Sequence, residues 1–298
     1  VGKTPFSFAG NEPDWLMRLM FGWWAQYQGA NELNTANSDV TATEGTFFEY
    51  WNYGSPEVFK QAGIEKAIDA FQSIFKGENG AVKNAPKSVR EKSTQDAERD
   101  FVNQDVAMIV CGAFAYNEVL PMLDNDGDGK QDFTMKMMNL PYVDGAQTGE
   151  DGKPLSMNLY NSEDVIIVPA EATNVKLAKD FLILLCEEES LLDYTKQCGE
   201  LRPFQYDLSL NEKDGFEYPA FTKSVIDIYN HTDVHLVRYP VGAEFSEVSY
   251  LYSYKQPLWT DAYTAFNGQL FSMDAASIAQ EIYKGAQKEW SIWESQVS

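Results

Sequence analysis

The stretch from Asp100 to Glu118 constrains the fold of this chain more than any other. Its polar first half suits a helix, and the apolar run that follows, Val106 to Cys111, is typical of a short buried strand. The run ends at Gly112, and a glycine at a strand end lets the backbone approach another backbone or a ligand closely. Because aromatic side chains just beyond a strand end can line a crevice, Phe114 and Tyr116 become candidate ligand contacts. A core strand that turns into an ordinary helix is the alternative.

Helical and strand-like patterns alternate along the rest of the chain. Apolar residues recur with helical spacing at 13–28, which Gly29 closes, and again at 63–76, before Gly77. The remaining expected elements are strands at 134–142 and 164–169, and helices near 115–123, 174–187, 189–197 and 274–290. Such alternation indicates α/β layers.

Composition and charge exclude some classes of function. With 298 residues, 44% of them hydrophobic, the chain can bury a large core. Its formal net charge of -22 argues against a nucleic-acid partner, because phosphates repel such a surface. No apolar run reaches about 18 residues, so we expect no membrane span.

The chain has three cysteines, Cys111, Cys186 and Cys198. Without a C-x-x-C spacing, they indicate neither a disulfide framework nor a zinc site. We expect buried free thiols, with a bridge between Cys186 and Cys198 as the alternative.

An acidic loop has the residue spacing of a calcium site. The carboxylates that would hold the cation stand at positions 1, 3, 5 and 9 of the loop, namely Asp124, Asp126, Asp128 and Asp132. Gly129 permits the turn, and the backbone carbonyl of Lys130 would add a further oxygen. Position 12 is Met135 rather than Glu, so the loop is not an EF-hand. We predict a structural Ca²⁺ site, and an acidic surface turn without metal is the alternative.

No arrangement of residues for catalysis stands out. The two histidines, His231 and His235, are four residues apart but lack the H-E-x-x-H pattern, and no P-loop or G-x-G-x-x-G is present. No nucleophile motif is present either. We therefore expect a protein that is not an enzyme, although so acidic a chain leaves paired carboxylates for glycoside hydrolysis open.

Four windows of the chain carry a resemblance to a known family. In the first, a helix-to-strand pattern F-x-x-G-x-A-A-M followed by G-x-W is matched by Phe101, Ala107, Met108, Gly112 and Phe114. Asp105 replaces a small residue of that pattern, and Phe114 replaces its Trp. The second window runs from Val165 to Asn174 and on through A-K-D-F-L-I-L-L, and it is similar to V-P-x-x-A-x-N-x-x-x-A-x-x-F-L-x-x-L.

The third window, at 198–203, is similar to G-x-x-P-x-R with the Arg and Pro exchanged, and the fourth is the closing helix at 274–290. In this order and at this spacing, the windows resemble the extracellular solute-binding proteins of ABC importers, the family that includes the maltose-binding protein. Only the later part of the family pattern is present. We therefore expect a fragment or truncated chain that lacks most of the N-terminal lobe. The remnant of that lobe should expose an apolar face and be mobile or paired with another chain.

The resemblance implies an α/β, type II periplasmic-binding-protein-like fold, mainly the C-terminal lobe with part of the N-terminal lobe. Residues 1–162 would form the main segment of the C-terminal lobe and 163–212 would belong to the N-terminal lobe. Residues 213–298 would return to the C-terminal lobe as helices.

The resemblance also implies a function. The protein would be an extracellular receptor, attached to the cell surface or periplasmic, that delivers a sugar or oligosaccharide to an ABC transporter permease. A lipid anchor outside this chain would be its only membrane association, and the full-length protein would be a monomer. A secreted glycoside-processing enzyme and a surface interaction module are the alternatives.

A sugar cleft needs aromatic rings for C–H faces and polar side chains for hydroxyls. The positions that correspond to the family's cleft, or offer such side chains nearby, are Asn11, Glu12, Trp15, Trp51, Gly112, Phe114, Tyr116, Asn161, Ser162, Glu163, Arg202, Phe245, Tyr250 and Tyr252. For each of them, core packing or plain surface is the alternative.

Overall fold

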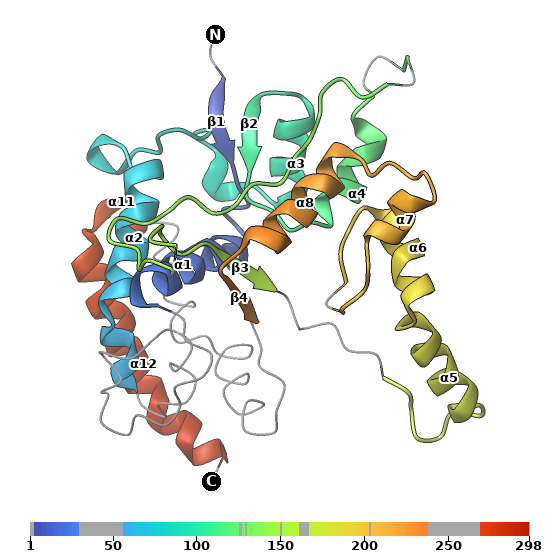
Figure 1. Ribbon diagram of the computed structural model, residues 1–298. Helices are drawn as coiled ribbons and strands as arrows, with labels where there is room; N and C mark the ends of the chain where they lie inside the picture. The colour runs from blue at the N-terminus through green and yellow to red at the C-terminus, as the bar shows by residue number, and fades with distance from the viewer. Residues whose placement is uncertain are drawn as a thin grey trace. The chain divides into compact units, whose positions relative to one another are not determined.

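The chain divides into two compact units, each described here by itself (Figure 1). The computed structural model describes residues 3–29, 56–124, 127–128, 130–149, 151–160, 167–202, 204–237 and 269–297. Unit 1 consists of Val1–Cys111, Asn139–Ser162 and Thr232–Ser298, and unit 2 consists of Gly112–Met138 and Glu163–His231. Which lobe of the expected fold each segment represents stays a prediction.

The described strands form two parallel pairs, both in unit 1. Strand β1 (Thr4–Ser7) pairs with β2 (Val106–Ile109) with Thr4 opposite Val106. Strand β3 (Met157–Tyr160) pairs with β4 (Val234–Val237) with Met157 opposite Val234. Parallel neighbours require long crossover connections, and helices form most of the described parts of these connections.

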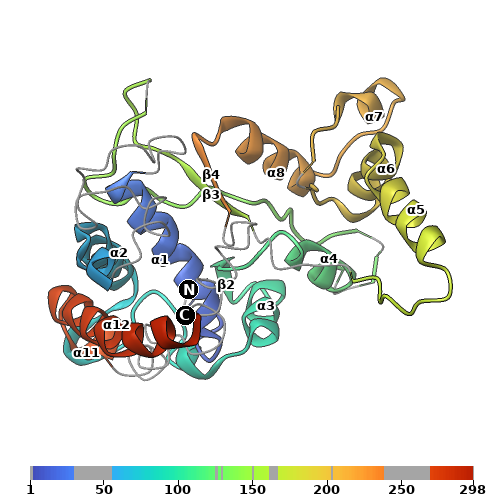
Figure 2. The same cartoon turned by 90° about the horizontal axis from the view of Figure 1, so that it is seen from below.

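Helices form the core of unit 1 (Figure 2). Helix α1 (Pro13–Gln28) lies against α2 (Ala62–Phe75), and α12 (Ala275–Val297) packs against α2 and the 3-10 helix η2 (Pro56–Lys60). The shorter elements are η3 (Glu78–Gly80), η4 (Val89–Glu91), α3 (Thr94–Val102) and α11 (Leu270–Ser272). The apolar stripe of α2 predicted from the sequence is confirmed, because Ile64, Ile68 and Phe71 are all at most 6% exposed.

Four phenylalanines occupy the centre of this core. The ring centroid of Phe71 lies 6.2 Å from that of Phe8, 5.0 Å from that of Phe75 and 5.8 Å from that of Phe271. Edge-on and tilted contacts of this kind stabilise aromatic clusters beyond the area they bury. The cluster joins the residue that follows β1 with α2 and α11, which are far apart in the sequence.

Two side chains join the segments that precede β3 and β4. The Asp233 carboxylate oxygen Oδ2 accepts hydrogen bonds from the Ser156 amide, at 2.7 Å, and from the Ser156 hydroxyl, at 2.8 Å. In return, the Asp233 amide donates to Ser156 Oγ at 3.0 Å. This reciprocal arrangement fixes the register of the second strand pair at its amino end.

Unit 2 is mainly helical in its described part. Its elements are α4 (Ala115–Val119), η5 (Leu120–Met122), α5 (Val175–Leu185), α6 (Glu188–Cys198), α7 (Ser209–Lys213) and α8 (Ala220–His231). Its core includes a parallel stack of Tyr116 on Phe221, with ring centroids 4.4 Å apart. Leu191, Leu192 and Tyr218 are buried in the same unit.

Two strand expectations differ from the structure. The segment 134–142 is not a strand, because it passes from unit 2 to unit 1 after Met138 and its Met137 amide donates to the Ser224 hydroxyl. The strand expected at 164–169 lies partly outside the described residues, and its described part, 167–169, is not a strand. Conversely, β3 and β4 were not expected. No helix in the described part of the chain is long and apolar enough to cross a membrane.

Candidate functional site

The loop between β1 and α1 is held against the segment before α3. The Gly10 amide donates to the Val89 carbonyl at 3.2 Å, and the Asn11 amide donates to the Lys92 carbonyl at 3.1 Å. A Cβ atom on Gly10 would lie 2.3 Å from the Val89 carbonyl oxygen, so only glycine fits this close approach. The loop that carries the first predicted site residues is therefore fixed by its backbone.

Glu12 connects this loop to the start of α3. Its Oε1 accepts a hydrogen bond from the Thr94 amide at 3.0 Å, and its Oε2 accepts one from the Thr94 hydroxyl at 2.6 Å. A carboxylate at a helix N-terminus satisfies an amide that has no partner within the helix. Ser93 caps the same helix in a reciprocal arrangement with Asp96. Glu12 thus has a structural role, and its predicted ligand contact stays a prediction.

Asn11 and Trp15 present polar and aromatic groups beside Glu12. Asn11 is exposed and its Nδ2 donates to the Glu91 carbonyl at 3.3 Å. Trp15 is half-buried, and the Arg18 guanidinium lies 4.2 Å from the centre of its ring system. An amide and an aromatic ring are the two kinds of side chain that a sugar contact requires. The structure therefore brings together three of the predicted residues at one end of unit 1.

In unit 2 the predicted aromatic residues occupy different environments. Phe114 is 36% exposed, whereas Tyr116 is 6% exposed and packs flat on Phe221. The Gly112 carbonyl accepts a hydrogen bond from the Ala115 amide, and this bond begins the turn into α4. Tyr116 therefore has the position of a core side chain, and Phe114 has the accessible ring.

Arg202 belongs to a polar cluster in unit 2. Its guanidinium carbon lies 3.9 Å from the centre of the Tyr194 ring, and the Tyr194 hydroxyl donates to Glu200 Oε2 at 3.0 Å. Asn117 Nδ2 donates to Glu200 Oε1 at 2.7 Å. We call these four residues, Asn117, Tyr194, Glu200 and Arg202, the arginine cluster. Arg202 is exposed, so the cluster presents a guanidinium supported on an aromatic face.

Tyr194 stays protonated at all physiological pH values. Burial and, next, the Glu200 carboxylate together raise the pKa of Tyr194 from its ordinary value of 10.0 to about 12, and Arg202 opposes this change. A tyrosine hydroxyl that keeps its proton remains a hydrogen-bond donor to Glu200.

Replacing Tyr194 by phenylalanine should change how stability depends on alkaline pH. Because the folded-state pKa is raised, the stabilisation is complete below pH 10 and is lost as pH rises through about 12. We expect the fall in stability over this window to be smaller in Tyr194→Phe than in the wild type, measured by urea unfolding at several pH values. Asn117→Ala is the control, because it removes the other bond to Glu200 and keeps the tyrosine. Identical alkaline profiles for the wild type and Tyr194→Phe would contradict the assignment.

The sequence did not identify Asn117, Tyr194 or Glu200. Asn117 and Glu200 are 83 positions apart in the chain, so no local pattern links them. The only available signal was the proximity of Glu200 to Gly199, whose left-handed backbone (φ 72°) ends α6. A Cβ atom on Gly199 would lie 2.8 Å from Thr222 Oγ1, so the turn that presents Glu200 and Arg202 is closely packed.

The other predicted ligand contacts lie outside the described residues, namely Trp51, Asn161, Ser162, Glu163, Phe245, Tyr250 and Tyr252. The predicted residues that are described fall into two groups. Asn11, Glu12 and Trp15 belong to unit 1, and Gly112, Phe114, Tyr116 and Arg202 belong to unit 2.

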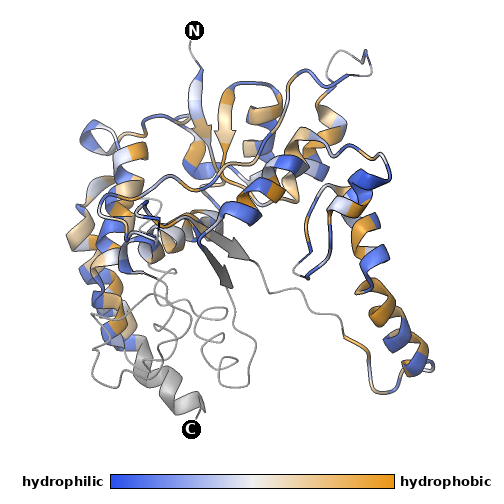
Figure 3. Ribbon diagram, viewed as in Figure 1, coloured by the Kyte–Doolittle hydropathy of each residue, from blue (hydrophilic) through white to orange (hydrophobic). Residues whose placement is uncertain are grey.

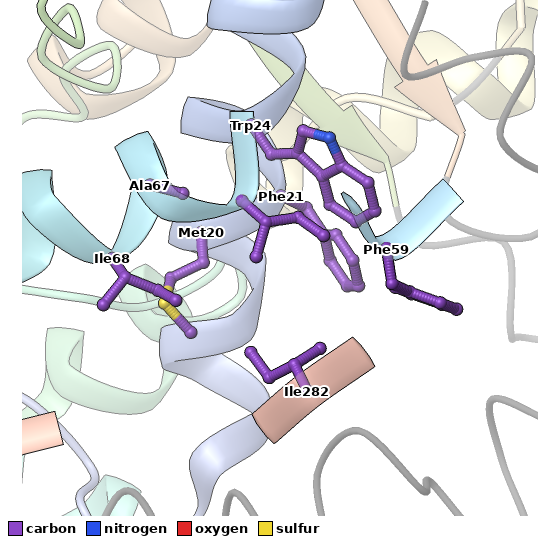
Figure 4. A pocket seen from close by; sticks show the side chains of 8 residues that line it. Met20, Phe21, Trp24, Phe59, Ala67, Ile68 and Ile282 are labelled. Atoms are coloured by element: carbon purple, nitrogen blue, oxygen red, sulfur yellow. The ribbon is translucent and has the colours of Figure 1, made fainter. Parts of the chain in front are cut away.

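An apolar pocket lies between α1, α2, η2 and α12 (Figure 4). Its lining residues are Met20, Phe21, Trp24, Phe59, Ile64, Ala67, Ile68 and Ile282. The Trp24 indole N–H donates to Gln61 Oε1 at 2.7 Å, so this ring keeps its polar group bonded within the protein. A sugar would lose hydrogen bonds in such surroundings, and we assign the pocket to core packing.

The acidic loop is described in part. The Asp132 amide donates to the Leu123 carbonyl at 2.7 Å and closes the loop, and Asp128 Oδ1 accepts the Lys130 amide at 2.8 Å. Asp126 and Gly129 lie outside the described residues. Among those that are described, no three His, Cys, Asp or Glu side chains converge to hold a metal ion. Because Asp126, one of the four predicted carboxylate ligands, lies outside the described residues, the calcium site stays a prediction.

All three cysteines are free thiols, and the alternative bridge is not formed. The expectation of burial was wrong for Cys186, which is exposed, and Cys111 and Cys198 are half-buried. Cys186 follows α5, which has no buried residue, and this explains its exposure.

Comparison with known proteins identifies the fold. No family model matches the chain, and no curated protein matches it. Among solved structures, the solute-binding protein RafE in complex with raffinose matches 96% of the chain with a TM-score of 0.54 and 15% identity. The maltotriose-binding protein of Thermus thermophilus, bound to maltotriose, matches 95% with a TM-score of 0.53 and 16% identity.

A sugar transporter from Bacillus licheniformis, in complex with stachyose, matches 95% of the chain with a TM-score of 0.51 and 12% identity. The chain has the fold of these sugar-binding proteins. This confirms the predicted type II periplasmic-binding-protein-like fold. The chain spans only 60–62% of the length of these three structures.

Proposed function

We propose that this chain is part of an extracellular receptor that binds a sugar or oligosaccharide and delivers it to an ABC transporter permease. The observation that carries the proposal is the fold, which the chain shares over almost its whole length with proteins solved with raffinose, maltotriose and stachyose. Identities of 12–16% leave the ligand of this chain open.

Two groups of side chains support a carbohydrate ligand. Asn11 and Trp15 offer an amide and an aromatic ring in unit 1, and Phe114 and Arg202 offer an exposed ring and an exposed guanidinium in unit 2. Sugars bind through C–H contacts with rings and hydrogen bonds to hydroxyls, and these groups supply both. Binding would be without turnover, and closure of two lobes around the ligand would accompany it.

The proposed receptor also has an expected location, membrane anchor, oligomeric state and metal site. The protein would act outside the cell, attached to the surface or in a periplasm, and a lipid anchor outside this chain would hold it there. It would be a monomer when full length. The acidic loop from Asp124 to Asp132 would bind one structural Ca²⁺ through its four aspartates and the Lys130 carbonyl.

Isothermal titration calorimetry tests the sugar ligand. Raffinose, maltotriose, stachyose and a wider glycan panel would be titrated into the 298-residue chain. Saturable heat without release of reducing ends supports the receptor. Release of reducing ends would indicate a glycoside-processing enzyme, and no response to any glycan would indicate an interaction module.

Substitutions then test which residues touch the sugar. For a glycan that binds, Trp15→Ala and Arg202→Ala should each weaken the affinity by about tenfold, which corresponds to about 1.4 kcal/mol. Lys179→Ala, which changes an exposed side chain on another helix of unit 2, is the control and should leave the affinity unchanged. Equal affinities for all variants would remove these residues from the site.

A further inference from the structure

The Arg202 side chain is supported on one face and accessible along its edge. Its guanidinium carbon lies 3.9 Å from the centre of the Tyr194 ring, and the residue is exposed. A guanidinium that stacks on an aromatic ring keeps its N–H groups in its own plane, where a ligand can reach them. No carboxylate in the described part of the chain forms an ion pair with Arg202. Its charge is therefore available to a partner outside the protein.

The carboxylate of Glu200, two positions before Arg202, bonds to other donors. Its Oε2 accepts the Tyr194 hydroxyl at 3.0 Å, and its Oε1 accepts Asn117 Nδ2 at 2.7 Å. A guanidinium and a carboxylate bind each other strongly when both are free to turn. Because two neutral donors hold Glu200, the arginine cluster keeps its carboxylate bound and its guanidinium open.

The backbone that carries Arg202 is also fixed. The Arg202 amide donates to the Tyr206 hydroxyl at 3.1 Å, and this hydroxyl is 2.7 Å from Thr195 Oγ1. Thr195 is completely buried on α6, a helix whose ribbon carries both hydropathy colours in Figure 3. A donor that is held in place before binding loses less conformational freedom when the ligand arrives.

An aromatic ring lies beside the arginine cluster on α4. Phe114 directly precedes α4 and is partly exposed, and its carbonyl accepts the Asn117 amide at 3.0 Å. Residues three positions apart share one face of a helix, so Phe114 and the side chain of Asn117 are neighbours. Phe114 and the arginine cluster all belong to unit 2. This surface therefore combines a ring, an amide and an open guanidinium.

We infer that Phe114 and the arginine cluster bind a sugar that carries a carboxylate, such as a uronic acid. The inference rests on the proposed function and narrows its ligand class. A guanidinium binds the two oxygens of a carboxylate through two parallel hydrogen bonds, whereas a sugar hydroxyl offers it a single oxygen. The ring suits the C–H face of the same sugar. A phosphorylated sugar fits less well, because its second negative charge adds to the repulsion from Glu200.

The net charge of -22 does not prevent an anionic ligand from binding. At physiological ionic strength, exposed charges more than about 8 Å apart are largely screened from each other. The groups in direct contact with the ligand therefore decide the affinity. Glu200 is the opposing charge within the arginine cluster, and it should lower the affinity for an anion without abolishing it.

An NMR titration of the ¹⁵N-labelled 298-residue chain tests this ligand class. Galacturonic acid and N-acetylneuraminic acid would each be compared with their methyl esters, which are neutral and otherwise the same. The Arg202 Nε–H signal, identified by its loss in Arg202→Lys, should shift on addition of an acid. The Kd of an acid should be at least about tenfold lower than that of its ester. The acid that binds more tightly distinguishes a uronate from a sialic acid.

Matched substitutions separate the charge from the shape of the site. Arg202→Lys keeps the charge but loses the two-pronged geometry, so it should weaken binding of the acid about threefold, and Arg202→Gln should weaken it at least about tenfold. Glu200→Gln should act in the opposite direction and strengthen binding of the acid about two- to threefold. Lys179→Gln removes an exposed positive charge elsewhere in unit 2 and should change nothing. Melting curves check that each variant is folded.

The outcomes distinguish this inference from the proposed function. Equal affinities for acid and ester would overturn the inference and leave the sugar receptor standing. Preference for the acid that persists in Arg202→Gln would also overturn it, because another group would then hold the carboxylate. Tighter binding of glucose 6-phosphate than of either acid would do the same. If no glycan binds, acidic or neutral, the proposed function and the inference fail together.

Discussion

Replacing Phe71 by alanine should lower the free energy of unfolding of unit 1 by about 3–5 kcal/mol, the range for truncating a buried phenylalanine. Phe71 is 0% exposed and its ring contacts the rings of Phe8, Phe75 and Phe271. Its removal leaves a cavity beside Phe8, Phe75 and Phe271, and these rings come from three separate segments, which limits how far that cavity can collapse.

The tryptophans allow this effect to be measured on unit 1 alone. All seven tryptophans of the chain fall in the three segments of unit 1, and the segments of unit 2 contain none. Urea unfolding followed by tryptophan fluorescence therefore reports unit 1, and circular dichroism reports the helices of both units.

Phe181→Ala provides the matched control for Phe71→Ala. It makes the same chemical change at a side chain that is 55% exposed, so it should change stability by only about 0.5 kcal/mol in the 298-residue chain. Comparable losses in the two variants would contradict the burial pattern on which both assignments depend.

Adding Ca²⁺ to chelator-treated protein should raise its melting temperature. A ligand that binds only the folded state stabilises it by about 2.7 kcal/mol at 100 times Kd and by about 4.1 kcal/mol at 1,000 times Kd. For a chain of this size, each kcal/mol corresponds to about 2–4 °C, so the expected rise is roughly 5–15 °C. Magnesium should substitute poorly, because it requires a tighter octahedron and keeps its waters.

The chain offers a close control for the calcium experiment. Asp128 and Asp151 each precede a Gly-Lys pair, and each accepts the amide of the lysine two positions later, at 2.8 Å and 2.9 Å. Asp128→Asn should abolish the response to calcium, whereas Asp151→Asn should keep it. If Asp128→Asn and the wild type melt alike with and without calcium, the loop is an acidic turn and no metal site.

Helix prediction from the sequence succeeded where a long apolar period was present. The helices expected at 13–28, 174–187 and 189–197 correspond to α1, α5 and α6. Strands β3 and β4 were missed because each is short and its apolar residues are interrupted by Asn158 or His235, whereas β2, of the same length, lies within the continuous apolar run from Val106 to Cys111. The segment 134–142 was expected as a strand, but in the described part of the chain it pairs with no strand.

Much less of the candidate site could be predicted. Asn11, Glu12 and Trp15 were predicted as candidate ligand contacts, but the Thr94 partner of Glu12 is 82 positions away and no local pattern indicates it. Tyr116 follows a strand end as an exposed ligand contact would, yet Phe221 covers one face of its ring. Such pairings are decided by tertiary packing, which a single sequence does not display.

The strand pairing of unit 1 has a consequence for how the chain folds. Thr4 pairs with Val106, and Met157 pairs with Val234, so each sheet closes a long loop before any hydrogen bond of its ladder forms. Topologies of this kind fold slowly, and during synthesis β1 has to wait for residues about a hundred positions behind it. Helices α1 and α2 can meet early, whereas α12 follows α2 by about two hundred residues and joins the core later. Until α12 packs, the part of α2 and η2 that it covers stays open to solvent, so partly synthesised chains expose an apolar surface that favours aggregation.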